Sequence, residues 1–151
     1  MSGPLDLLFL GTGNGFASGG RYWSSFLINE RYLIDCCPVA LPHLKKEEVA
    51  LEEIEAVLIS HFHGDHINGL VGADNKPAFA NAEVMVPEVE WAFWADESNT
   101  SKLPEIARPQ MGNVKRVFGV LGNKVTKYQA GKELVPGITA VMWRIRMAGC
   151  R

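Results

Sequence analysis

The stretch HFHGDH at residues 61–66 places four side chains that can bind a metal within six positions, namely His61, His63, Asp65 and His66. The apolar run AVLI at residues 56–59 directly precedes it and predicts a buried strand. Because side chains alternate along an extended segment, the first two histidines project to the same side. The glycine that follows allows a sharp turn, so the aspartate and the third histidine can face a second point nearby.

The residue types in this stretch indicate metal chemistry. Imidazole nitrogens and carboxylate oxygens are the ligands of hydrolytic zinc, iron and manganese sites. The alternative is a polar loop near a sheet edge, which would suit a lone histidine better than four candidate ligands after an apolar strand. The spacing therefore predicts a site for two neighbouring divalent metals rather than one.

Residues 61–66 resemble the HxHxDH motif of the metallo-β-lactamase-fold hydrolases. The resemblance implies an α/β protein with an αββα sandwich, of which this chain contains mainly the N-terminal half. It also implies that His61 and His63 bind one metal, and that Asp65 and His66 bind the other. The expected cofactor is Zn²⁺ at both sites, with iron or manganese as alternatives. In the complete family fold the metals activate a water molecule, and Asp65 acts as the catalytic residue that holds and orients it.

The N-terminal part offers a second interpretation, nucleotide binding. A predicted strand at Leu5–Leu10 leads into a loop with five glycines at residues 11–20. However, the loop lacks the Gly-Lys-Ser/Thr ending of a phosphate-binding loop, and Phe16 breaks the GxGxxG fingerprint. A similar strand and loop open the proteins that resemble ribonuclease Z, whereas residues 81–94 look more like glyoxalase- or lactonase-like hydrolases. We therefore expect a small ester, lactone, thioester or phosphodiester substrate and predict no single one.

Other segments predict ordinary α/β elements. Residues 24–29 and 31–35 predict a hairpin, whose turn type stays open because Glu30 is a poor residue for positive φ. Asp35 either supports a ligand histidine by hydrogen bonding or serves as a turn or helix-cap carboxylate. We predict helices at 38–48 and 113–121, strands at 83–86 and 125–128, and Pro87 as a first helical residue. For the aromatic residues that follow Pro87, packing is favoured over lining a substrate pocket.

Size and composition predict one domain spanning residues 1–151. The formal net charge of -2 gives no attraction to nucleic acid or to anionic membranes. Since the N-terminus lacks the basic region of a secretory signal, we expect a cytoplasmic location. The three cysteines, Cys36, Cys37 and Cys150, form no disulfide framework, and a core or loop role is favoured over zinc binding.

The end of the sequence departs from the family pattern. Family members present further metal ligands after a segment like residues 133–141, but no histidine follows His66 here. We favour a truncated product of a longer hydrolase gene, because half a sandwich would leave an apolar sheet face in water. The alternative is a natural half-domain, which dimerisation across that face could rescue. Weak metal binding with little turnover is expected, and the competing hypothesis is a catalytically dead fold remnant or binding module.

Overall fold

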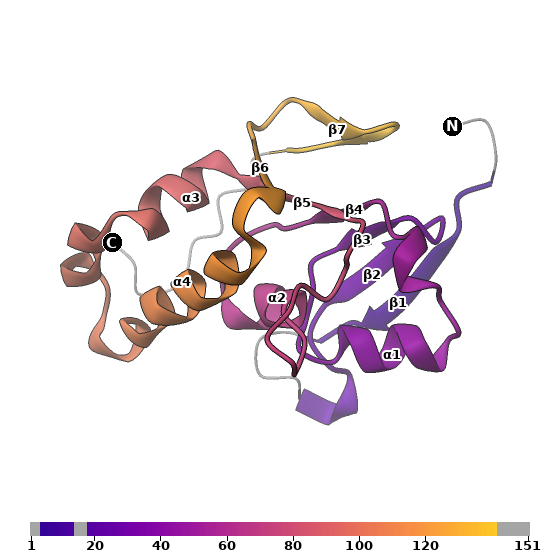
Figure 1. The fold of residues 1–151 in the computed structure, drawn as a ribbon, viewed down its shortest axis with the longest axis horizontal. Coiled ribbons are helices and arrows are strands. Elements are labelled where there is room, and N and C mark those ends of the chain that lie inside the picture. The colour runs from indigo at the N-terminus through magenta and orange to yellow at the C-terminus, as the bar shows by residue number, and fades with distance from the viewer. Residues whose placement is uncertain (1–3, 14–17, 142–151) are drawn as a thin grey trace.

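A six-stranded sheet with the strand order β1-β2-β3-β4-β5-β6 forms the centre of the computed structural model, which describes residues 4–13 and 18–141 (Figure 1). The first three strands pair antiparallel, and β3 to β6 pair parallel. The strands are β1 (Leu7–Gly11), β2 (Ser25–Ile28), β3 (Tyr32–Ile34), β4 (Ala56–Leu58), β5 (Glu83–Pro87) and β6 (Val125–Tyr128). A separate antiparallel hairpin joins β7 (Glu133–Val135) to β8 (Ile138–Thr139).

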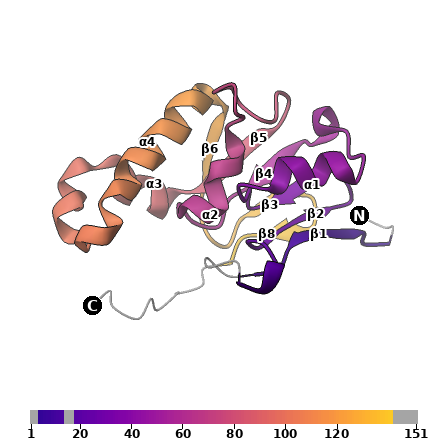
Figure 2. The same cartoon turned by 90° about the horizontal axis from the view of Figure 1, so that it is seen from below.

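Helices follow the strands that pair in parallel. They are α1 (Ala40–Lys46), α2 (Gly64–Ile67), α3 (Glu88–Ala95) and α4 (Pro109–Leu121). Short 3₁₀ turns complete the connections at η1 (Ser18–Gly20), η2 (Leu51–Glu53), η3 (Asn68–Leu70), η4 (Glu97–Lys102), η5 (Glu105–Ala107) and η6 (Gly122–Lys124). Two views at right angles place α1, α2 and α4 on one face of the sheet and the β7–β8 hairpin on the other (Figures 1 and 2).

The alternation of side chains along the strands explains these two layers. Val57 of β4 is fully buried in the core beneath the helices, whereas its neighbours Ala56 and Leu58 belong to the cluster on the opposite face. On β5, Val84 likewise belongs to the core beneath the helices and Met85 to the cluster on the opposite face. Strands that are apolar on both faces are typical of parallel sheets covered on both sides. The run AVLI is therefore apolar throughout because both faces of its strand are buried.

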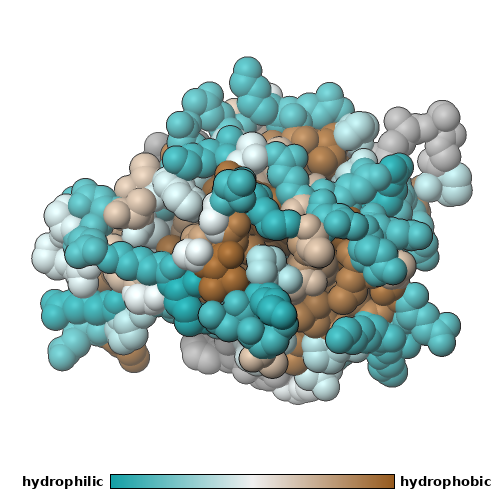
Figure 3. All heavy atoms as spheres, in the orientation of Figure 1, coloured by the Kyte–Doolittle hydropathy of each residue, from teal (hydrophilic) through white to brown (hydrophobic). Residues whose placement is uncertain are grey.

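The second face of the sheet is only partly covered. Leu134 and Ile138 of the β7–β8 hairpin pack against the cluster that contains Tyr32. On the edge strand β1, Leu7 remains 41% exposed and Phe9 remains 59% exposed. The apolar face expected from the sequence thus exists, with its middle strands covered by the hairpin. On the face drawn in Figure 3, hydrophilic residues cover much of the surface, and hydrophobic residues show between them.

The turn between β2 and β3 has a backbone conformation with positive φ, which the sequence made unexpected at Glu30. Asn29 has a φ of 50° and Glu30 a φ of 56°, so both residues are in the left-handed region of a type I′ hairpin turn. The antiparallel pairing of the two strands holds this turn, and the side-chain oxygen of Asn29 accepts a hydrogen bond from the backbone N–H of Asp6 at 2.8 Å. Tertiary pairing thus overrides the local preference of Glu30.

Two predicted boundaries around the later helices were wrong. Pro87 ends β5 with an extended backbone and precedes α3, so it is not the first helical residue. The helix predicted from residue 113 instead begins at Pro109, whose fixed φ suits the first turn. Residues 142–147, in which bulky residues alternate with arginines as in a strand, lie outside the described residues. In the described part of the chain, no helix has the length and apolar character needed to cross a membrane.

The central strands should carry most of the stability of this fold. Leu33 is fully buried in β3, so Leu33→Ala should lower the free energy of unfolding by about 2–5 kcal/mol through lost burial and an internal cavity. Leu7→Ala is the matched control on the edge strand, where the side chain is already exposed, and it should cost much less. Urea denaturation followed by circular dichroism measures both values. Equal losses for the two variants would contradict the assigned core.

Candidate metal centre

The HFHGDH stretch lies at the carboxyl end of β4, where the chain leaves the buried sheet. The backbone N–H of Ile59 donates to the carbonyl of Met85 on β5 at 2.9 Å, so the strand is held up to this point. The carbonyl of Ile59 also accepts a hydrogen bond from the Tyr128 hydroxyl at 2.7 Å, and burial raises the pKa of that phenol to about 12. Helix α2 (Gly64–Ile67) then begins directly after His63. The predicted ligands are thus presented by a rigid strand end.

The fold brings the four predicted ligands together. The ring centroids of His61 and His63 are 4.7 Å apart, and those of His61 and His66 are 4.0 Å apart. Asp65 Oδ2 lies 3.3 Å from His66 Nε2. The histidines therefore form one continuous cluster rather than two separate pairs.

The donor chemistry of this cluster fits a zinc-type metal, since it offers imidazole nitrogens and a carboxylate. Among the residues that the structure describes, however, no group of three or more histidine, cysteine, aspartate or glutamate side chains is arranged to hold a metal ion. Asp65 and His66 instead contact each other directly. The assignment of His61, His63, Asp65 and His66 as metal ligands therefore stays a prediction.

Asp35 takes the supporting role that the sequence left open. Its Oδ2 accepts hydrogen bonds from His66 Nδ1 and from the Ser60 hydroxyl, both at 2.8 Å, and its Oδ1 accepts one from the Ser60 N–H at 2.8 Å. The residue has a φ of 54°, so a left-handed backbone at the end of β3 directs the carboxylate to this position. Asp35 thus ties β3 to both ends of the HFHGDH stretch.

These hydrogen bonds decide which nitrogens of two histidines remain available. The Ser60 hydroxyl has one proton and donates it to Asp35, so it accepts from His61 Nδ1–H at 3.0 Å. His66 Nδ1–H donates to Asp35. In both rings Nε2 is therefore the nitrogen left for a proton or a metal, which is the arrangement that supporting residues impose on ligand histidines.

The cluster also separates the proton affinities of its members. Burial lowers the pKa of His61 to about 4, and the positive charges of His66 and His63 act in the same direction. Burial also opposes protonation of His66, but its hydrogen bonds to Asp35 and Asp65 outweigh this effect and raise its pKa to about 9. The hydrogen bond from His66 lowers the pKa of the Asp65 carboxyl. At neutral pH, the protein without metal carries the proton on His66 and not on His61.

Phe62, between the first two histidines, anchors the stretch to the helices. Its side chain is 1% exposed and packs on Phe118 of α4 with 4.5 Å between ring centroids. Glu90 Oε2 of α3 accepts from the Phe62 N–H at 3.0 Å and from Trp94 Nε1 at 3.0 Å. Gln110 Nε2 of α4 donates to the Phe62 carbonyl. Sequence reasoning missed Glu90 and Gln110, because their bonds to the Phe62 backbone join residues 28 and 48 positions apart and leave no local spacing pattern.

The cysteines pack behind the site and are structural. Cys36 and Cys37 are free and buried, and burial raises the pKa of both thiols, which makes thiolate ligands unfavourable. The Cys36 N–H donates to the His66 carbonyl at 2.7 Å, and the Gly69 N–H donates to the Cys36 carbonyl at 3.0 Å. The favoured interpretation of these residues as core is confirmed, and Cys150 lies outside the described residues.

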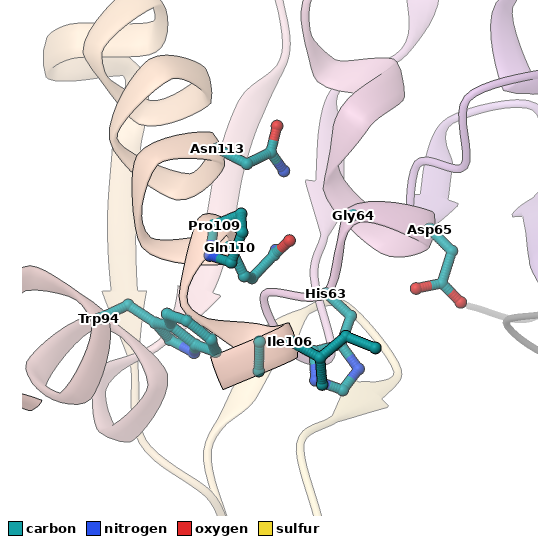
Figure 4. A pocket seen from close by; sticks show the side chains of 9 residues that line it. His63, Gly64, Asp65, Trp94, Ile106, Pro109, Gln110 and Asn113 are labelled. Atoms are coloured by element: carbon teal, nitrogen blue, oxygen red, sulfur yellow. The ribbon is translucent and has the colours of Figure 1, made fainter. Parts of the chain in front are cut away.

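A pocket of about 430 Å³ opens beside the cluster (Figure 4). His63, Gly64 and Asp65 form one side of it. The remaining lining comes from α3, η5 and α4, and consists of Trp94, Ile106, Ala107, Pro109, Gln110 and Asn113.

Of the four histidines in the sequence, only His43 lies apart from the cluster, and its Nδ1 is 2.7 Å from the Leu10 carbonyl.

The contact between Gly69 and the cysteine loop should tolerate no side chain. A Cβ at Gly69 would lie 2.3 Å from the Cys37 carbonyl oxygen and 2.9 Å from that of Cys36, so the backbone must move. Gly69→Ala should therefore lower the free energy of unfolding by about 1–3 kcal/mol. Gly119→Ala in α4 is the matched control, because nothing lies within 4 Å of its Cβ, and it should be neutral or stabilising. Thermal denaturation compares the two, and equal stability would contradict the close packing.

The Asp35–His66 hydrogen bond predicts a proton affinity that can be measured directly. In protein freed of metal, NMR titration should find the His66 pKa near 9, and Asp35→Asn should move it back toward 6.5, the ordinary pKa of histidine. Because the folded pKa is the higher one, this interaction stabilises the protein fully below pH 6.5, and its contribution is lost as the pH rises through 9. Asp74→Asn, at an exposed turn, is the control that should leave His66 unchanged. An unshifted His66 in the Asp35 variant would contradict the proposed cause.

Comparison with curated proteins finds sequence similarity in the first part of the chain. Ribonuclease Z from Listeria monocytogenes serotype 4a (strain HCC23) is 36% identical over 85 residues, which cover 52% of this chain and 28% of that protein. The chain therefore matches less than a third of the length of this relative.

Solved structures show the fold. Hydrolase AbOPH of the β-lactamase superfamily superposes with a TM-score of 0.65 and 24% identity over 73% of this chain and 44% of that one. The dizinc quorum-quenching lactonase AidC gives a TM-score of 0.64 and 23% identity over 74% of this chain and 45% of that one. The expected α/β fold of the metallo-β-lactamase type is confirmed.

A family model matches more than half of the 151-residue chain. It is described as Anti-Pycsar protein Apyc1 and covers residues 5–88. The match includes the whole HFHGDH stretch and also Asp35 and Ser60, which hydrogen-bond to the side chains of His66 and His61. The chain belongs to the family of the Anti-Pycsar protein Apyc1.

Proposed function

We propose that this chain carries part of the active site of a metal-dependent hydrolase that cleaves a small phosphodiester. The observation that carries the proposal is the orientation of His61 and His66, whose Nδ1–H groups bond to Ser60 and Asp35. Nε2 is then the nitrogen that each ring would use to bind a metal, and in His66 it faces Asp65 Oδ2 at 3.3 Å. The similarity to ribonuclease Z covers about half of this chain. A ribonuclease cleaves a phosphodiester, so this relative supports a phosphodiester substrate over an ester, lactone or thioester. The net charge of -2 supports a small substrate rather than a nucleic acid.

In this proposal His61, His63, Asp65 and His66 hold two zinc ions, with iron or manganese as alternatives. When bound, such metals supply an acidified water as nucleophile and polarise the scissile bond. Asp35 and Ser60 keep protons on the Nδ1 atoms and thereby direct the Nε2 lone pairs to one place. Asp65 would hold and orient the attacking water through its carboxylate. The pocket beside His63 would receive the rest of the substrate.

A catalytic zinc usually has three protein ligands, and the described residues form no such group. We therefore propose that a further ligand comes from another chain or from Cys150, which lies outside the described ranges. The exposed Leu7 and Phe9 support self-association through the second sheet face. The two free, buried cysteines suit a reducing compartment, so we propose a cytoplasmic site of action.

The competing proposal is a binding module without catalytic activity. The same lack of a three-donor group among the described residues favours it. The two proposals differ in what Asp65 does, because a binding module needs no residue to orient a water. Metal-dependent hydrolysis that disappears in Asp65→Asn would refute the binding module.

Metal content and hydrolysis of bis(p-nitrophenyl) phosphate test the hydrolase proposal together. The purified protein should contain zinc, iron or manganese. Loss of a residue that supports a ligand weakens metal binding by about 10–100-fold, and His63→Ala, which removes a ligand, should weaken it by more. His43→Ala is the matched control, because His43 lies apart from the cluster, and it should retain the metal. Hydrolysis should stop when a chelator removes the metal, should return when the metal is added back, and should disappear in His63→Ala. Metal content at background level in the unmodified protein would refute the proposal.

A further inference from the structure

The pocket beside the candidate metal centre has two sides of different origin. His63, Gly64 and Asp65 lie within residues 5–88, which match the family model. The opposite wall, which we call the α3–α4 wall, consists of Trp94, Ile106, Ala107, Pro109, Gln110 and Asn113, and all six lie beyond that match. The candidate metal ligands on one side of the pocket therefore lie within the family match, whereas the wall facing them lies outside it.

The side-chain N–H donors of the α3–α4 wall are already engaged within the protein. Trp94 Nε1 donates to Glu90, Gln110 Nε2 donates to the Phe62 carbonyl, and Asn113 Nδ2 donates to Asn68 Oδ1 at 2.8 Å. Arg116 in turn donates to Asn113 Oδ1 at 3.1 Å. These amide and indole groups fix the shape of the wall. What the wall offers to a ligand is mainly its carbon surface.

Ile106 is the most exposed large hydrophobic residue among those described, at 92%. It lies on the short turn η5, between the turn η4 and the start of α4. An aliphatic side chain in water on the wall of a pocket gains free energy when a ligand covers it. Figure 4 shows Ile106 and His63 in the same part of the pocket, with Trp94 on its other side. A group held against Ile106 would thus lie next to the candidate ligands.

We propose that the α3–α4 wall is the specificity subsite of this hydrolase and that it takes an apolar group of the substrate, aromatic or alkyl, beside the scissile bond. The inference rests on the proposed function for the position of the scissile bond. Ile106 provides the contact that distinguishes an apolar substituent from a small one. Pro109 and Ala107 extend this surface. Gln110 holds α4 against the HFHGDH stretch, and Asn113 holds it against Asn68, just after that stretch.

Two phosphonates of different size test this subsite without relying on turnover. The zinc-loaded protein is titrated with benzylphosphonate and with methylphosphonate, and binding is followed by NMR through the side-chain amides of Gln110 and Asn113. Benzylphosphonate should bind at least about tenfold more tightly, as expected for added apolar contact in a pocket. Ile106→Ser should remove this preference. Val89→Ser is the matched control, since Val89 is an exposed apolar residue of α3 outside the pocket.

The outcomes separate the subsite from the hydrolase proposal. Equal affinities for the two phosphonates, or a preference that survives Ile106→Ser, would overturn the subsite while leaving the metal centre intact. If the protein binds neither zinc nor phosphonate, the hydrolase proposal fails. Titration of the metal-free protein with benzyl alcohol then tests whether the α3–α4 wall binds an apolar group. Shifts of the Gln110 and Asn113 amides that depend on Ile106 would support an apolar subsite, and their absence would overturn it as well.

Discussion

The carboxylate of Asp35 joins the parts of the molecule on which the candidate site depends. Asp35 follows the end of β3, and its backbone carbonyl accepts a hydrogen bond from the Ser25 hydroxyl on β2 at 2.8 Å. From there it binds Ser60, just after β4, and His66 in α2. Because β3 and β4 are parallel neighbours, their carboxyl ends meet at one edge of the sheet. One buried acid can therefore position the histidines relative to the sheet.

The same stretch is held from the helical side through Phe62. This residue contributes no metal-binding group, yet its ring is buried between the sheet and α4, and its peptide groups bond to Glu90 and Gln110. A side chain anchored in the core fixes the spacing of the two histidines beside it. Functional groups held by packing and by supporting hydrogen bonds lose little freedom on binding a ligand. The cluster is thus supported from both sides before any ligand arrives.

The molecule divides its tasks along the chain. The part that matches the family, residues 5–88, contains the histidines, the hydrogen-bond partners of their side chains and the first five strands. The following part, from α3 to α4, adds no histidine or cysteine to the described cluster but forms most of the pocket lining. Loops and helices at the carboxyl end of a parallel sheet can vary without disturbing the strands. The pocket therefore joins one side that lies within the family match to a wall that lies outside it.

The sequence by itself determined the donor types and their presentation, because these depend on local periodicity. The run at residues 56–59 predicted a buried strand, and the alternation of His61 and His63 predicted neighbouring rings, which lie 4.7 Å apart. Only the tertiary structure decided the partners of these residues. Asp35 and Ser60 are separated by 25 positions, Phe62 and Glu90 by 28, and Phe62 and Gln110 by 48. Such contacts arise from sheet order and helix packing, which no local pattern encodes.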